Sequence, residues 1–302
     1  AAVIGGCVGT SCTYTAKAFG TIASGTMAHS FVQSFDSEYE AFKAYAEVYP
    51  DDCVLLIDTY DTINSGVQNA IKVFNDVLLP KGFRPKGVRL DSGDLAYLSK
   101  KIRKILDDAG FNDCKICVSN SLDENLITSL LEQGAKIDSF GVGENLITAK
   151  SDPVFGGVYK LCAIEKEGKI IPKIKISENT AKITNPGFKK SYRFYSKETG
   201  KALADVLALA GEEIPNNNFT IFDPLNPWRK KTLLNYTVRP LQEHIFENGS
   251  LIYENPSLSE ISKKCSKELD TLWDEIKRLD NPHKYYVDLS SDLWNLKNEM
   301  LK

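Results

Sequence analysis

The chain has 302 residues, of which 42% are hydrophobic and 25% charged, and its formal net charge is −3. This balance is ordinary for a globular protein with a sizeable core, and it gives no electrostatic reason to expect nucleic acid or an anionic membrane as a partner. No apolar run approaches the ~20 residues of a membrane-spanning helix, and the start lacks the basic and apolar regions of a signal peptide. The seven cysteines are scattered and odd in number, which predicts reduced thiols and a cytoplasmic protein.

Residues 20 to 145 alternate between short apolar runs and amphipathic segments. Apolar side chains recur at helical spacing in four segments, and continuous apolar runs typical of buried strands separate them. The predicted strands are 21–28, 53–57, 87–90, 116–118 and 137–142, and the predicted helices are 38–49, 67–78, 95–109 and 122–133. This alternation predicts parallel βαβ units.

Each predicted strand ends in polar residues or glycine: His29-Ser30, Asp58-Thr59, Asp91-Ser92-Gly93-Asp94, Ser119-Asn120 and Gly141-Val142-Gly143. Ligands bind at the carboxyl ends of strands both in α/β barrels and in open parallel sheets. The five strand ends therefore predict one site on one face. The pattern favours a barrel only modestly over a doubly wound sheet.

The character of the sequence changes after about residue 150. Apolar runs at 158–163 and 170–176 flank the turn Glu165 to Lys169, which predicts a hairpin. Lysine-rich sequence that we expect to be irregular continues through Pro186 to the 224–231 segment. Ser257 and Glu260 form a capping box for a helix whose apolar stripe runs from Leu258 to Leu279, and a last short helix is expected over 289–301. We expect two parts, 1–160 and 161–302, the second a hairpin and helical region.

The segment Arg89-Leu90-Asp91-Ser92-Gly93-Asp94 combines a guanidinium, two carboxylates, a hydroxyl and a glycine at one strand end. Arginine binds carboxylate or phosphate in a bidentate manner, and aspartate holds Mg²⁺ or sugar hydroxyls. The alternative is a solvated turn in which Asp91 or Asp94 caps the helix that begins near Leu95. Both interpretations stay open on this segment alone.

His29 is one of three histidines in the chain. A lone histidine beside a strand is more often structural, but a carboxylate of the Asp58 to Thr62 segment on the adjacent strand could orient its imidazole. Gly141 and Gly143 offer backbone N–H groups to a phosphate, although a simple turn is the usual meaning of such a pair. Cys114 and Cys117 form a C-x-x-C motif inside a predicted strand, without a second motif or a nearby histidine, so we expect neither a zinc site nor a redox pair there.

Several ordered motifs together resemble the nicotinate phosphoribosyltransferase family. They are Gly9-Thr10-Ser11, Gly25-Thr26-Met27-Ala28-His29-Ser30, Asp58-Thr59-Tyr60-Asp61-Thr62, Gly87 to Leu95, Phe140-Gly141-Val142-Gly143 and the tail Arg278-Leu279-Asp280-Asn281-Pro282-His283. The resemblance runs across essentially the whole chain. It implies the fold of type II phosphoribosyltransferases: an irregular α/β barrel, incomplete here, with a smaller mixed α/β C-terminal part.

The resemblance also implies roles for individual residues. His29 matches the histidine that ATP phosphorylates, with Asp58 orienting it, while Arg89 would contact the nicotinate carboxylate and Asp91 the ribose or Mg-diphosphate. Ser119, Asn120 and the amides of Gly141 and Gly143 would hold the 5-phosphate of phosphoribosyl pyrophosphate. The further substrate-binding candidates are Thr10, Ser11 and Ser30 along the base pocket, together with Thr26, Ser92, Gly93 and Asp94. Asp91 and Asp94 are the candidate Mg²⁺ ligands.

The implied reaction forms nicotinate mononucleotide and diphosphate from nicotinate and phosphoribosyl pyrophosphate, coupled to ATP hydrolysis, in NAD salvage. Family members carry a region before the Gly9 motif that supplies an aromatic residue to the base site across a homodimer interface. Ala1 to Gly6 has no initiator methionine and resembles the middle of a helix, so we expect a segment of a longer protein. The alternatives are an inactive or complementing fragment of such an enzyme, or a relative specific for nicotinamide or quinolinate.

Overall fold

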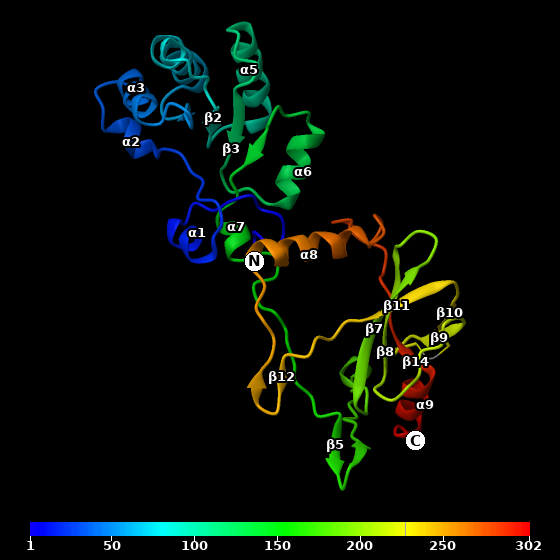
Figure 1. Ribbon diagram of the computed structural model, residues 1–302. Coiled ribbons are helices and arrows are strands. Elements are labelled where there is room, and N and C mark those ends of the chain that lie inside the picture. Colours follow the sequence, from blue (N-terminus) through cyan, green and yellow to red (C-terminus); the bar gives the residue numbers. More distant parts are fainter. Residues whose placement is uncertain (227) are drawn as a thin grey trace. The chain divides into compact units, whose positions relative to one another are not determined.

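The computed structural model describes residues 1–226 and 228–302. The chain divides into two compact units (Figure 1). We call Ala2 with Cys7–Phe155 the N-terminal unit, and Ala1, Val3–Gly6 and Gly156–Lys302 the C-terminal unit. Within the described ranges, every helix is too short or too polar to cross a membrane.

The N-terminal unit is built on a parallel four-stranded sheet of order β1-β2-β3-β4. Its strands are β1 Val54–Leu56, β2 Gly87–Leu90, β3 Lys115–Val118 and β4 Ser139–Phe140. Its helices are α1 Thr13–Phe19, α2 His29–Gln33, α3 Glu38–Val48, α4 Val67–Val73, α5 Leu95–Asp108, α6 Glu124–Glu132 and α7 Glu144–Ile147, with the short turns η1 Thr62–Gly66, η2 Phe74–Leu78 and η3 Leu79–Lys81. The predicted βα alternation over residues 53–140 is confirmed.

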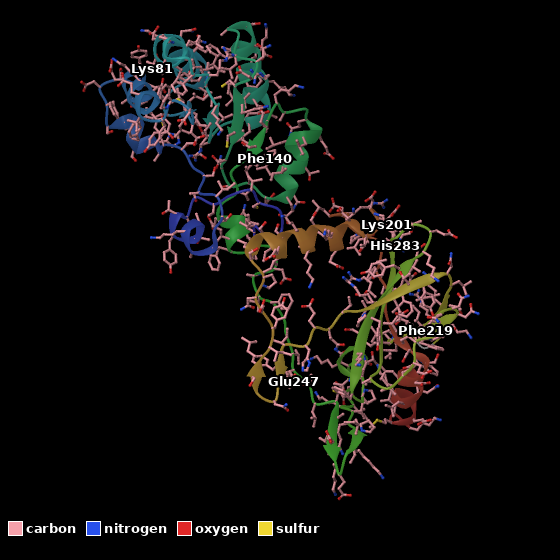
Figure 2. All side chains as sticks on the ribbon, in the orientation of Figure 1. Lys81, Phe140, Lys201, Phe219, Glu247 and His283 are labelled. Carbon is pink, nitrogen blue, oxygen red and sulfur yellow. The ribbon has the colours of Figure 1, made fainter. Side chains whose placement is uncertain are left out.

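Apolar burial fixes this sheet. Leu55, Leu56, Val88 and Ile116 are fully buried in one hydrophobic cluster with residues of the surrounding helices. Continuous apolar runs of this kind are typical of strands covered on both faces. Figure 2 labels Phe140, at the end of β4, which packs against this cluster.

The strand predicted over residues 21–28 is wrong. The structure has only one isolated parallel bridge there, between Thr10 and Ala23, and Ala28 is the residue that precedes α2. The small polar residues Ser24 and Gly25 are exposed and offer no apolar face to bury, and a strand is stable only with such a face and a paired neighbour. His29 therefore begins a helix and does not end a strand.

The C-terminal unit contains a mixed six-stranded sheet of order β10-β9-β14-β8-β7-β11. Its sheet strands are β7 Lys189–Ser196, β8 Ala202–Leu209, β9 Phe219–Phe222, β10 Lys230–Leu233, β11 Tyr236–Pro240 and β14 Val287–Ser290. The remaining elements are the hairpins β5 Ala163–Lys166 with β6 Lys169–Pro172 and β12 Phe246–Glu247 with β13 Ser250–Leu251, the turn η4 Thr180–Lys182, and the helices α8 Leu258–Asp270 and α9 Ser291–Glu299. The core of this sheet includes Phe194 and Phe219, whose rings stack. Figure 2 labels Phe219.

The expectation of irregular sequence up to residue 231 is wrong for this sheet. Burial alternates strictly along β8, and its buried positions are Ala202, Ala204, Val206 and Ala208. Alanine is small enough that the period-two pattern gives little hydrophobic contrast in the sequence, so the strand is easily missed. The predicted hairpin is present, but its strands are Ala163–Lys166 and Lys169–Pro172 and not 158–163 and 170–176. Glu167 and Gly168 are both at positive φ in its turn.

The two predicted C-terminal helices are confirmed with shorter limits. Ser257 and Glu260 form the predicted capping box, but α8 ends at Asp270, well before Leu279. Leu289 lies in β14, where it pairs with both β8 and β9, and Ser290 caps α9. Leu289 and Ser290, which the helical spacing predicts to lie in the last helix, instead belong to strand β14.

Candidate functional site

Side chains from three successive strand ends meet beside α2. Asp58 follows β1, Arg89 and Asp91 lie at the end of β2, and Ser119 follows β3. Because β1, β2 and β3 are parallel and adjacent, their carboxyl ends lie at one edge of the sheet. His29, the first residue of α2, completes the cluster, which we call the His29 cluster.

The imidazole of His29 contacts groups on both of its nitrogens. Its Nδ1 lies 3.1 Å from the Thr59 hydroxyl oxygen. Its Nε2 faces two carboxylates, Asp91 at 3.6 Å and Asp58 at 4.0 Å. Two acceptors on the Nε2 side favour a proton there, which leaves Nδ1 to accept from the Thr59 hydroxyl.

Asp58 is the most constrained member of the cluster. Its side chain is only 1% exposed, and its Oδ2 accepts hydrogen bonds from the Asp91 backbone N–H at 2.7 Å and the Ser92 hydroxyl at 2.6 Å. Its Oδ1 is buried without a hydrogen-bond partner in the described chain. A buried carboxylate oxygen without a donor costs free energy, and His29 is the group that faces it.

A close backbone approach holds Asp58 in place. Gly66, the last residue of η1, lies so near the Ile57 carbonyl that a Cβ atom there would be 1.7 Å from the carbonyl oxygen. No residue other than glycine fits without movement of the backbone.

Asp61 begins this turn, and its Oδ1 accepts from the Ile63 and Asn64 N–H groups at 3.0 and 2.8 Å.

Arg89 links the strands of the cluster. Its Nε donates to the Ser119 hydroxyl at 3.0 Å, and its Nη1 donates to the Thr26 hydroxyl at 3.2 Å. Its Nη2 lies 3.2 Å from Asp91 Oδ1, and the Ser119 hydroxyl donates to the same oxygen. The guanidinium is a quarter exposed, so a second N–H of Nη2 remains for an incoming acceptor.

The charge of Asp91 is stabilised by this network. Burial opposes ionisation, but the hydrogen bond from Ser119, the charge of Arg89 and the neighbouring imidazole of His29 outweigh it, so the pKa of Asp91 is below its usual value. Asp91 therefore carries a full negative charge next to His29 and Arg89 at neutral pH.

The next carboxylate of the segment, Asp94, caps a helix. Its Oδ1 accepts from the Tyr97 N–H at 2.9 Å, so it is the N-cap of α5. Gly93 has a φ of +78°, which glycine adopts without strain. Of the residues in this segment, Arg89, Asp91 and Ser92 join the His29 cluster.

The loop after β3 carries backbone strain. Asn120 and Ser121 have φ values of +103° and +47°, and the side-chain amide of Asn145 donates to the Ser121 and Leu122 carbonyls at 3.0 and 3.1 Å. Strained non-glycine residues concentrate at ligand-binding sites. Asn145 lies in α7, so it ties this loop to the one after β4.

The glycines after β4 differ in what their amides do. The Gly141 N–H donates to the Val118 carbonyl at 2.7 Å. This hydrogen bond extends the sheet, so the N–H group already has a partner. Gly143 directly precedes α7. A phosphate-binding role in this loop therefore rests more on Gly143 than on Gly141.

Thr10, Ser11 and Ser30 lie outside the contacts of the His29 cluster among the described residues. The Thr10 N–H donates to the Ile22 carbonyl at 2.9 Å and the Thr10 carbonyl accepts from Ser24. Ser30 is the exposed second residue of α2. Thr26, two residues beyond Ser24, reaches Arg89.

Models of known families match nearly all of the chain. The model described as the nicotinate phosphoribosyltransferase (NAPRTase) family matches residues 2–206, and the model of the nicotinate phosphoribosyltransferase C-terminal domain matches residues 188–297. The chain belongs to the nicotinate phosphoribosyltransferase family.

Relatives agree with this assignment. The chain is 46% identical over 302 residues to the nicotinate phosphoribosyltransferase of Bacillus subtilis, covering 100% of this chain and 61% of that protein. It is 34% identical to the human nicotinate phosphoribosyltransferase, covering 87% of this chain and 49% of that protein. The chain therefore spans about half to three fifths of the length of these relatives.

Solved structures match the fold. The crystal structure of human nicotinic acid phosphoribosyltransferase aligns with a TM-score of 0.78 at 27% identity, covering 99% of this chain and 66% of that chain. A nicotinate-nucleotide pyrophosphorylase from Pyrococcus furiosus has the same fold over 89% of this chain, with a TM-score of 0.57 and 24% identity. The mixed α/β architecture of this family member is thus shared with solved structures.

Two residues in and around the His29 cluster have contacts that their local sequence does not predict. Thr59 was quoted within its motif without a role, yet it is the partner of His29 Nδ1. Asn145 follows the Gly141-Val142-Gly143 turn, and its side-chain amide donates to the Ser121 and Leu122 carbonyls in the loop after β3. The signal for Thr59 was its position directly after Asp58 at a strand end, whereas Asn145 acts over a distance of more than 20 residues that no local pattern reveals.

Proposed function

We propose that this chain supplies the phosphoryl-accepting and phosphoribosyl-binding part of a nicotinate phosphoribosyltransferase. The reaction forms nicotinate mononucleotide and diphosphate from nicotinate and phosphoribosyl pyrophosphate, driven by ATP through a phosphohistidine, and it serves NAD salvage. The observation that carries the proposal is the His29 cluster: one imidazole between Thr59 and the carboxylates of Asp58 and Asp91.

His29 is the phosphoryl acceptor. The unprotonated Nδ1 of the neutral imidazole leaves its hydrogen bond with Thr59 and attacks the γ-phosphorus of ATP. The N–P bond forms, the bond to the β-phosphate oxygen breaks, and ADP leaves. The ring becomes cationic, and the buried Asp58 Oδ1, which lacks a donor in the described chain, then gains a charged partner. Asp58 thereby stabilises the phosphorylated state more than the free state.

Arg89 and Asp91 bind the reactants. The remaining N–H of the Arg89 guanidinium pairs with the carboxylate of nicotinate, and Asp91 holds the ribose hydroxyls. The ring nitrogen of nicotinate attacks C1 of the ribose while the bond from C1 to the diphosphate oxygen breaks. Ser119, Asn120 and Gly143 hold the 5-phosphate, and Thr10, Ser11 and Ser30 line the base pocket.

Mg²⁺ fits this site through a single carboxylate. In the described part of the chain, no three His, Cys, Asp or Glu side chains gather as a cage for a metal, and Mg²⁺ is commonly held by one or two carboxylates together with substrate phosphates. Asp91 is suited to this, because Ser119 and Arg89 contact its Oδ1, while the described contact of its Oδ2 is His29 at 3.6 Å. Asp94 is the weaker ligand, since its Oδ1 caps α5. When bound, Mg²⁺ neutralises charge on the departing diphosphate.

The whole enzyme needs more than this chain. The chain spans 61% of the Bacillus subtilis relative, and we propose that the remaining region completes the base site across a homodimer interface in the cytoplasm. The same coverage favours a second candidate function, a complementing fragment that keeps the phosphoryl-accepting site but needs a partner segment for turnover.

Phosphorylation of His29 is tested by labelling with [γ-³²P]ATP. The expected result is an acid-labile, base-stable label that is lost in His29→Ala and retained in His244→Ala and His283→Ala, which change the other two histidines of the chain. Asp58→Asn is expected to slow labelling about a hundredfold, since it removes the charge that faces the imidazole. A label that survives His29→Ala contradicts the phosphohistidine proposal.

Turnover is tested separately with nicotinate, phosphoribosyl pyrophosphate and Mg-ATP. The reaction is run with the chain alone and with an added N-terminal segment from a full-length relative. Formation of nicotinate mononucleotide only in the second reaction supports the complementing-fragment function, and turnover by the chain alone removes it.

A further inference from the structure

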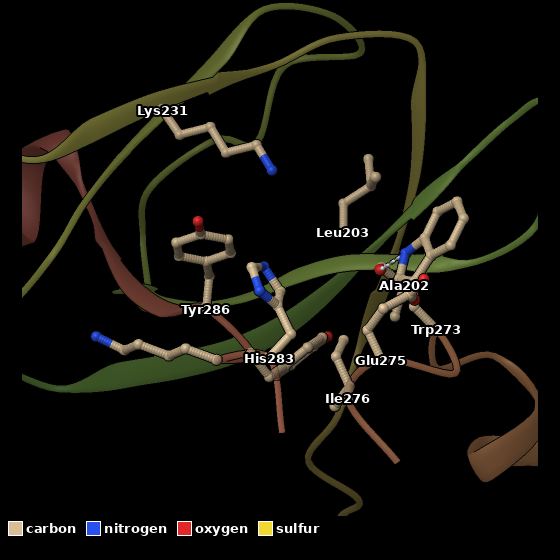
Figure 3. A pocket seen from close by; sticks show the side chains of 10 residues that line it. Ala202, Leu203, Lys231, Trp273, Glu275, Ile276, His283 and Tyr286 are labelled. Carbon is tan, nitrogen blue, oxygen red and sulfur yellow. Dashed lines mark hydrogen bonds between the residues drawn. The ribbon is translucent and has the colours of Figure 1, made fainter. Parts of the chain in front are cut away.

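The C-terminal unit contains a cavity of about 420 Å³ that the proposed reaction does not use (Figure 3). Its walls come from β8, from β10, from the segment after α8 and from the segment that leads into β14. The last of these segments includes His283, the final residue of the Arg278 to His283 motif. This motif therefore borders a cavity of the size that accommodates a small ligand.

Hydrogen bonds within the unit hold the cavity open. The Trp273 indole N–H donates to the Ala202 carbonyl at 3.0 Å (Figure 3). The backbone N–H of His283 donates to the Glu275 carbonyl at 2.9 Å, and the carbonyl of Tyr286 accepts from Asp205 in β8. These hydrogen bonds fix the backbone of the wall and the Trp273 indole, whereas Lys231, Glu275 and His283 are exposed.

The cavity contains the ammonium of Lys231, whose positive charge partly offsets the burial-raised pKa of Asp288. The Lys231 ammonium lies 4.9 Å from the centroid of the Tyr286 ring, and none of the described carboxylates forms an ion pair with it. Lys284, also in the wall, is paired with the buried Asp223 at 3.3 Å. An anionic group of a ligand would therefore be bound by Lys231.

The rest of the wall suits a flat ring and its hydroxyl groups. In the view of Figure 3, Lys231, Tyr286 and His283 lie to one side of the cavity, and Leu203, Trp273 and Glu275 lie to the other. Aromatic and aliphatic side chains bind the faces of a heterocycle, and the Glu275 carboxylate accepts hydrogen bonds from hydroxyl or amino groups.

We propose that this cavity binds a nucleoside monophosphate, with the phosphate at Lys231, the base against Tyr286 and Trp273, and polar hydrogens of the nucleoside at Glu275. The cavity lies wholly within the C-terminal unit. It is a second nucleotide site, independent of the His29 cluster.

The test measures binding of adenosine 5′-monophosphate to the full chain by calorimetry. Lys231→Met is expected to weaken binding about tenfold, since it removes a charge-assisted contact. The matched control is Lys230→Met on the same strand, whose side chain does not line the cavity, and it is expected to leave binding unchanged. Lys231→Arg restores the charge and is expected to restore binding. Adenosine and inorganic phosphate, each lacking one half of the ligand, are expected to bind at least tenfold more weakly.

A second variant separates the two nucleotide sites. Arg89→Met alters the His29 cluster and is expected to leave adenosine 5′-monophosphate binding at the C-terminal cavity unchanged. If Arg89→Met loses all binding of adenosine 5′-monophosphate and Lys231→Met binds it normally, the cavity proposal is overturned. The same result still agrees with the proposed function. Absence of saturable binding up to millimolar concentrations overturns it as well.

Discussion

An arginine and an aspartate form an ion pair in each unit, and the two pairs differ in how fully their hydrogen-bonding groups are used. In the C-terminal unit, Arg193 contacts both oxygens of Asp205, at 2.7 and 2.9 Å. The Tyr285 hydroxyl donates to the same carboxylate at 2.8 Å, and the third guanidinium nitrogen meets Glu268 at 3.0 Å. Every nitrogen of this guanidinium has a charged partner.

The pair in the N-terminal unit is looser. Arg89 meets Asp91 through one contact of 3.2 Å, and its other nitrogens are satisfied by hydroxyl groups. The adjacent Asp58 keeps a buried oxygen without a donor. A cluster in which every polar group has a partner stabilises the fold. Donors and acceptors without a partner, as in the N-terminal unit, remain to bind a reacting ligand.

Replacing each arginine in turn should show which ion pair stabilises the fold and which one serves the reaction. Arg193→Met leaves Asp205 partly buried without its cation, whereas Glu268 keeps Arg239 at 2.8 Å, and it is expected to cost about 3 kcal/mol of unfolding free energy. Arg89→Met is expected to cost about 1 kcal/mol, since its partners are mostly neutral hydroxyls, while abolishing product formation in the complemented assay. Equal losses of stability in the two variants contradict the comparison.

Each unit has its own probe for these measurements. All three tryptophans, Trp228, Trp273 and Trp294, lie in the C-terminal unit, so their fluorescence in urea follows that unit. Cys53 and Cys114 are buried in the N-terminal unit, and burial raises the pKa of each thiol to about 12. Their reaction with a thiol reagent therefore reports unfolding of the unit that contains the site.

Gly66→Ala tests how rigidly the backbone holds Asp58. The added Cβ would overlap the Ile57 carbonyl oxygen, so we expect a loss of about 2 to 3 kcal/mol, measured by thiol reactivity. Gly25→Ala is the matched control in the same unit, because no atom lies within 4 Å of its Cβ position, and its stability should be unchanged. A tolerated Gly66→Ala would mean that the Asp58 backbone moves freely.

Asp94 variants distinguish a helix cap from a metal ligand. Asp94→Ala is expected to cost about 1 kcal/mol, and Asp94→Ser to cost less, because serine also caps helices well. If Asp94 acts only as the cap, the Mg²⁺ dependence of product formation in the complemented assay is unchanged in Asp94→Ser. A raised Mg²⁺ requirement in Asp94→Ser would instead support Asp94 as a ligand.

The smallest effect expected is a change in the acid dependence of stability. The pKa of Asp91 is lowered in the fold, so its stabilising contribution is present above its unfolded pKa and is lost as the pH falls through its folded pKa. Asp91→Asn should therefore flatten the loss of stability below about pH 4, measured by urea unfolding followed by far-UV circular dichroism.

Asp288 in the C-terminal unit provides the opposite case. Burial, with the charge of Asp223, raises its pKa, so protonation on acidification favours the folded state. Asp288→Asn should remove this increase in stability at low pH, and tryptophan fluorescence in urea measures it. The same sign of change in Asp91→Asn and Asp288→Asn would contradict the comparison.

Local patterns predicted the parallel sheet and most of its site. Cys53 to Ile57 forms a continuous apolar run ending in Asp58, and such a run specifies both a buried strand and the place where its polar end lies. His29 was found through its motif, although the strand expected to carry it is a helix start in the structure.

The remainder depends on contacts between distant residues. Thr26 and Arg89 are 63 residues apart, and Tyr285 and Asp205 are 80 residues apart. The six-stranded sheet was missed because alanines fill the buried face of β8. Its pairing with β14 depends on a partner more than 75 residues away along the chain, which no window of local periodicity contains.

Asp58, Asp91 and Ser119 each stand just beyond a strand whose own residues make up the buried core. Residues that set reactivity are thus separate from residues that set the fold. A substitution at a strand end alters reactivity, while the apolar residues of the strand continue to specify the sheet. A protein engineer could therefore vary Asp91 and Ser119 to alter reactivity while leaving the buried strand residues unchanged.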